Sequence, residues 1–60
     1  MNPEQQQAID QVLALRELSR TTGTKTTRAI NLVLQSLKDA DLIVVAKALH
    51  DAGFNGEVLR

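Results

Sequence analysis

Apolar residues recur at helical spacing along the first third of the chain, which predicts an amphipathic helix over about residues 3–21. Its predicted inward face consists of Ala8, Ile9, Val12, Leu13, Leu15 and Leu18. Asn2 is a suitable N-cap, Pro3 fits the first helical position, and Gln5 can close a capping box. Gly23 supplies the left-handed residue that commonly ends a helix.

A second helix is predicted over about residues 25–38, after a threonine-rich stretch. Threonine is a weak helix former but a good N-cap, so we expect Thr24 to cap this helix and Lys25 to begin it. Its apolar stripe is Ala29, Ile30, Val33, Leu34 and Leu37. Lys38 is a favourable charge for the C-terminal end of a helix.

A third helix is predicted over about residues 40–52, with Asp39 or Asp41 as its cap and the other aspartate in its first turn. Its apolar face consists of Leu42, Val45, Ala46, Leu49 and Ala52. Gly53 lies where a Schellman motif places its left-handed residue, and Phe54 is expected to contact Leu49 as the hydrophobic pair of that motif. Residues 54–60 are expected to form a short tail.

The connections between these helices are short, so consecutive helices must pack as neighbours. The sequence therefore predicts one all-α domain over residues 1–60, a compact three-helix bundle. Such a small core rarely holds a chain folded without a disulfide, a metal or a partner subunit. The sequence has no cysteine and one histidine, which leaves self-association. We expect a homodimer, with its interface formed by the surplus apolar residues Leu15, Leu32, Ile43 and Val44.

Charge is divided unevenly along the chain, although seven basic residues balance seven acidic ones. The segment 16–38 holds five basic residues and one acidic residue, a net charge of +4, and the rest of the chain carries a net charge of −4. Local potential steers association with charged partners more than total charge does, so the basic segment is compatible with an anionic partner. A chance distribution in a short chain is the alternative.

The segment 18–32 resembles the helix-turn-helix of bacterial and phage DNA-binding proteins. Leu18, Ser19, Gly23 and Leu32 match its pattern of a small residue inside the first helix, a turn glycine, and apolar residues that lock the second helix. Thr24 and Ala29 depart from that pattern, which favours a larger apolar residue at each place. The resemblance implies a small regulator whose second helix approaches DNA. An ordinary helix–glycine–helix corner is the alternative.

A second observation points to the same place. Lys25 and Arg28 lie near the start of the second predicted helix, where free backbone N–H groups and threonine hydroxyls also suit a phosphate. Asn31 has the amide group that pairs with adenine. The candidate nucleic-acid-binding residues are Arg20, Thr24, Lys25, Thr26, Thr27, Arg28 and Asn31. The alternative is that the two long basic side chains simply extend into solvent.

The rival function is a protein–protein interaction module, in which Leu32, Ile43 and Val44 dock a partner helix and nucleic acid is not bound. Zero net charge and a single aromatic residue favour this rival. We do not expect an enzyme, because Ser19, Ser36 and His50 come without the strand-borne elbow or oxyanion hole that nucleophilic catalysis needs. We also expect no cofactor and no metal site, since His50 has no second histidine or cysteine to act with it.

Segment 1–7 lacks the basic and apolar regions of a secretory signal, and the apolar run 42–46 is far too short to span a bilayer. The expected location is therefore the cytoplasm, without membrane contact.

Overall fold

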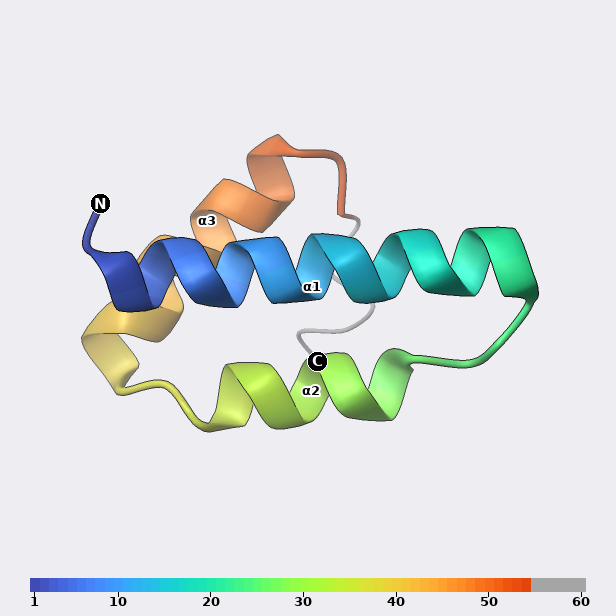
Figure 1. Ribbon diagram of the computed structural model, residues 1–60. Helices are drawn as coiled ribbons and strands as arrows, with labels where there is room; N and C mark the ends of the chain where they lie inside the picture. Colours follow the sequence, from blue (N-terminus) through green and yellow to red (C-terminus); the bar gives the residue numbers. More distant parts are fainter. Residues whose placement is uncertain (55–60) are drawn as a thin grey trace.

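The computed structural model describes residues 1–54, which form three α-helices: α1 (Pro3–Thr22), α2 (Thr27–Gln35) and α3 (Asp39–Asp51). Both shorter helices pack mainly against α1, and α2 runs antiparallel to it (Figure 1). The expected all-α, three-helix architecture is confirmed. Within the described residues, no helix has the combination of length and apolarity needed to cross a bilayer.

The core joins all three helices. Its buried side chains are Ala8, Ile9, Val12, Ile30, Leu34, Val45 and Leu49. Further apolar side chains are half-buried and pack against this core: Leu13, Leu15, Val33, Leu37, Leu42, Ala48 and Phe54. Leu15 therefore belongs to the margin of the core, contrary to its expected role as a surplus residue. Leu18 is 45% exposed because α1 is more than twice as long as α2, so its C-terminal end has few neighbours.

The ends of α1 follow the expected local chemistry. The Asn2 side chain accepts a hydrogen bond from the Gln5 backbone N–H at 2.8 Å, and the Gln5 side chain accepts one from the Asn2 N–H at 3.3 Å. This reciprocal pair is the capping box, with Pro3 in the first helical position. Gly23 has a left-handed φ of 73°, and its N–H donates to the Ser19 carbonyl at 3.0 Å.

The start of α2 differs from the prediction. Thr24 does not cap the helix and Lys25 lies outside it, because Thr26 is held in a non-helical conformation just before Thr27. The Thr26 side chain is buried, and its hydroxyl donates to the Leu15 carbonyl at 3.0 Å, across from α1. The Thr24 hydroxyl is instead hydrogen-bonded to that of Thr22 at 2.9 Å.

At its other end α2 stops at Gln35, three residues before the predicted end at Lys38. Ser36 is the C-cap, and its hydroxyl donates to the Val33 carbonyl at 2.7 Å. A short serine that bonds back to the last turn offers the chain a local alternative to further helix.

The third helix begins one residue earlier than predicted. Lys38 occupies its N-cap position without a side-chain cap, so neither Asp39 nor Asp41 is the cap and both lie in the first turn. There they complement the positive end of the helix. The Asp41 carboxylate also accepts a hydrogen bond from the Gln5 side-chain amide at 2.8 Å, which ties the start of α3 to the start of α1.

The predicted Schellman motif at the end of α3 is confirmed. Gly53 has a φ of 98°, its N–H donates to the His50 carbonyl at 3.0 Å, and the Phe54 N–H donates to the Leu49 carbonyl at 3.1 Å. The Phe54 side chain packs against the buried core. The predicted tail, apart from Phe54, lies outside the described residues.

Candidate nucleic-acid interface

The solvent-facing side of α2 carries the densest group of predicted site residues. Ile30 and Leu34 turn toward the core, so the residues at the opposite side of the helix point outward. Together they line one shallow surface depression, and we call this set the α2 outer face: Thr27, Arg28, Asn31, Leu32 and Gln35. Arg28, Asn31, Leu32 and Gln35 follow the i, i+3, i+4, i+7 spacing of one helical row.

The chemistry of the α2 outer face suits a nucleic acid. Arginine binds phosphates and guanine edges, while asparagine and glutamine form paired hydrogen bonds with adenine. Within residues 1–54, no side-chain hydrogen bond or ion pair involves Arg28, Asn31 or Gln35. No acidic residue occurs in the sequence between Leu18 and Lys38. The row therefore offers free donors and acceptors without a carboxylate to repel an anion.

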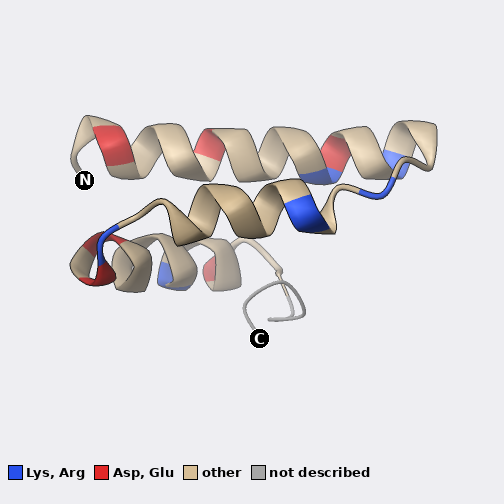
Figure 2. Cartoon of the chain, turned by 90° about the horizontal axis from the view of Figure 1, so that it is seen from below, with Lys and Arg blue, Asp and Glu red and all other residues tan. Residues whose placement is uncertain are grey.

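In Figure 2, α2 and the connection before it carry basic residues and no acidic ones, whereas α1 and α3 carry both signs. Lys25 lies in the exposed connection before α2, and Arg28 lies in the first turn of α2. The first turn contains no acidic residue and has no side-chain cap, so the partial positive charge of the helix end is not offset there. The anionic side chains of residues 1–54 belong to α1 and to α3.

The remaining predicted residues have other places. Thr26 is buried and bonded to α1, so its hydroxyl is not available to a ligand. Thr24 is exposed but engaged with Thr22. Arg20 lies near the end of α1, where its guanidinium is 3.7 Å from the Glu17 carboxylate in an exposed ion pair. Thr27, Arg28 and Asn31 are thus brought together, and Lys25 lies close to them along the chain.

Gln35 is the member of the α2 outer face that the sequence prediction missed. It lies seven residues after Arg28, which is two helical turns, so the spacing alone places both on one side of the helix. The structure adds that α2 ends at Gln35, so Gln35 is the last residue of this helical row.

Arg16 is part of the basic segment but not of this surface. Its guanidinium carbon lies 4.7 Å from the centre of the Phe54 ring, and the guanidinium donates to the Ala52 carbonyl at 3.4 Å. It therefore joins α1 to the C-terminal end of α3, where a cation complements the helix dipole. Because Arg16 contacts the end of α3, the α2 outer face has less positive charge near it than the net charge of segment 16–38 suggests.

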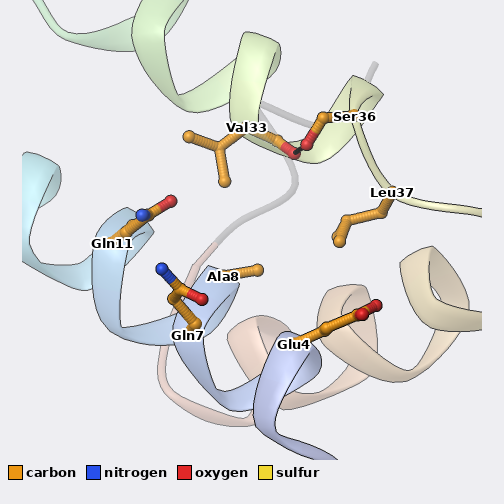
Figure 3. A pocket seen from close by; sticks show the side chains of 7 residues that line it. All are labelled: Glu4, Gln7, Ala8, Gln11, Val33, Ser36 and Leu37. Carbon is orange, nitrogen blue, oxygen red and sulfur yellow. Dashed lines mark hydrogen bonds between the residues drawn. The ribbon is translucent and has the colours of Figure 1, made fainter.

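A shallow groove of about 290 Å³ lies between the N-terminal half of α1 and the end of α2 (Figure 3). Ala8, Val33 and Leu37 supply its apolar lining, and Glu4, Gln7, Gln11 and Ser36 supply the polar lining. The Ser36 hydroxyl donates to the Val33 carbonyl and makes no hydrogen bond to Glu4, which is the one carboxylate among the seven lining residues. Within residues 1–54, three metal-ligating side chains do not gather anywhere.

The resemblance to a helix-turn-helix is local. The two helices of that motif cross at about 90–120°, whereas α1 and α2 run antiparallel (Figure 1). Leu18 and Leu32 are 45% and 61% exposed, so neither locks α2 against α1 as the motif requires. A DNA-binding role must rest on the α2 outer face itself. Comparison with family models, with curated protein sequences and with solved structures finds no match.

Proposed function

We propose that this chain binds double-stranded DNA through the α2 outer face, with Lys25 as a further phosphate contact. The observation that supports this most is the row Arg28, Asn31 and Gln35, in which Arg28 and Gln35 are exposed, Asn31 is half-buried, and no acidic residue lies on the same helix. Asparagine and glutamine pair with adenine edges in the major groove, and arginine binds phosphates as well as guanine edges.

The dimensions of α2 agree with this role. A nine-residue helix is about 14 Å long and fits the width of the major groove with its axis inclined. Arg28 and Lys25 would contact phosphates at the N-terminal end, where the helix dipole adds to their charge. Asn31 and Gln35 would face base edges, and Leu32 between them would contact a thymine methyl group.

The test is a mobility-shift titration with mixed DNA duplexes of about one helical turn, so that only one copy binds each probe. We expect binding that weakens steeply with salt, and K25Q and R28Q should each lower the salt slope by about one. K47Q removes the same charge from α3 and is the matched control. Absence of binding at low salt, or an equal effect of K47Q, would contradict the proposal.

A second candidate has its own support. Leu32, Ile43 and Val44 are 61%, 70% and 38% exposed, as the sequence predicted. Exposed apolar side chains on two helices favour a protein–protein interaction module, either a homodimer or an adaptor for a partner helix. For such a module, substitution of Ile43 should abolish the interaction, whereas K25Q and R28Q should leave it unchanged.

A further inference from the structure

The outward side of α3 carries two large apolar residues in a charged setting. Ile43 and Val44 are 70% and 38% exposed, while Val45 and Leu49 on the other side of the helix are buried. Asp39 and Lys47 are also exposed and lie four residues before and four residues after Ile43, on the same side of α3. Asp51, exposed at the C-terminal end of the same row, forms no ion pair with Lys47 within the described residues. We call Asp39, Ile43, Val44 and Lys47 the α3 outer face.

The two charges on this face cannot neutralise each other within one chain. Eight residues separate them, which is about 12 Å along a helix, well beyond the reach of an ion pair. Within the described part of the chain, neither Asp39 nor Lys47 takes part in an ion pair. A helix face with an anion at one end, a cation towards the other and apolar residues between them can pair with a second copy of itself that runs in the opposite direction.

A second copy of α3, laid antiparallel about the Ile43–Val44 pair, satisfies both charges at once. In that register Ile43 faces Val44 of the second copy, and Lys47 lies level with Ala40 of the second copy, next to its Asp39. A two-fold axis repeats each of these contacts, which is the property of an isologous interface. The small exposed side chain of Ala40 leaves room for the lysine to lie across it.

We propose that the α3 outer face is a homodimer interface in which two copies of α3 pair antiparallel. The thirteen-residue helix is about 20 Å long, so the buried area falls below that of a standard interface, about 1,200 Å² or more. The dimer is therefore weak and exchanges readily. It rests on the second candidate function and restricts the interface of that candidate to α3, without Leu32. It leaves the α2 outer face free and does not depend on DNA binding, so the dimer and the DNA proposal can fail separately.

Charge reversal in trans tests this pairing. K47D places a carboxylate opposite Asp39, and D39K places an ammonium group opposite Lys47, so each single variant should self-associate at least about tenfold more weakly than the parent chain. An equimolar mixture of K47D and D39K should form a heterodimer, because each contact then joins opposite charges. Sedimentation equilibrium, with circular dichroism to confirm folding, measures all three samples.

A pair of neutral substitutions covers the case in which D39K weakens folding at the start of α3. I43S should abolish self-association, whereas L32S, which removes a similarly exposed leucine from α2, should leave it unchanged. A chain that stays monomeric at millimolar concentration, a mixture that does not associate, or equal effects of I43S and L32S would each overturn the proposed interface.

Discussion

Single side chains in this protein connect elements that the backbone alone would leave loosely joined. Thr26 bonds to the Leu15 carbonyl of α1 from the segment before α2, and Gln5 bonds to Asp41 at the start of α3. At the other end of α3, Arg16 reaches the Ala52 carbonyl and the Phe54 ring. Each contact joins polar groups of two different elements, so polar side chains contribute to the packing of the helices as well as to solubility.

The bond of Thr26 can be measured with an isosteric change. T26V keeps the shape of the buried side chain but removes its hydroxyl donor, so we expect a loss of about 1 kcal/mol in the free energy of unfolding. T24V removes an exposed hydroxyl and should change stability by less than about 0.5 kcal/mol. Urea denaturation measures both, and equal losses would show that the buried bond contributes nothing specific.

The helices differ in how far local chemistry determines their ends. Asn2, Gln5 and Gly23 bound α1, and Gly53 ends α3, all through groups within a few residues of the helix they cap. The beginning of α2 depends instead on a carbonyl of α1, and its first turn has neither a side-chain cap nor an acidic residue. Its N-terminal end is the least locally stabilised of the helix boundaries that the structure describes.

That distinction explains part of what the sequence could predict, although the end of α2 and the cap of α3 were wrong despite being local. The ends of α1 and the Schellman motif follow from neighbouring residues, so they were predicted correctly. The start of α2 was placed too early because the competing partner of Thr26 lies eleven residues away in sequence. The position of Arg16 over Phe54 was missed for the same reason, since it spans from one helix to the end of another.

Gly53 provides a test at the end of α3. Its φ of 98° is strained for any residue with a Cβ atom, even though no heavy atom beyond the neighbouring residues lies within 4 Å of where that atom would stand. We therefore expect G53A to lower the free energy of unfolding by about 1 kcal/mol through backbone strain alone. A thermal or urea transition measures it, and a stabilised variant would mean that α3 continues through this position.

The first turn of α2 allows stability and binding to be separated. R28E exchanges a cation for an anion at the positive end of the helix, so stability should rise by about 0.3–1 kcal/mol at low salt. DNA binding should weaken by orders of magnitude if the α2 outer face is the contact surface. Urea denaturation and the mobility-shift titration provide the two readouts. A destabilised variant would show that Arg28 has a structural role.

At the scale of the whole molecule, α1 serves as the common wall against which the two shorter helices pack. The seven buried apolar side chains come from all three helices, and no single helix supplies more than three of them. For a core of this size, the free energy of unfolding is the small difference between the large contributions of apolar burial and conformational entropy. The loss of one central side chain should therefore affect the entire fold.

Leu49 is the natural place to measure this dependence, because it is 1% exposed and is among the largest fully buried side chains. L49A should cost about 2–5 kcal/mol, enough to remove much or all of the net stability of so small a domain. L32A, at a leucine 61% exposed, is the control and should cost less than about 0.5 kcal/mol. Circular dichroism at 25 °C distinguishes them, and an L49A chain as helical and heat-resistant as L32A would contradict the expectation.

The helix α1, against which the other two pack, is also the first of the three helices to be synthesised. Its buried residues Ala8, Ile9 and Val12 share one core with residues of α2 and α3, so the core is complete only once residue 49 has left the ribosome. Before α2 follows, α1 is an amphipathic helix with its apolar side open to water, and such isolated helices are only marginally stable. During synthesis α2 is therefore the first element that can cover part of this apolar side, and α3 completes the cover.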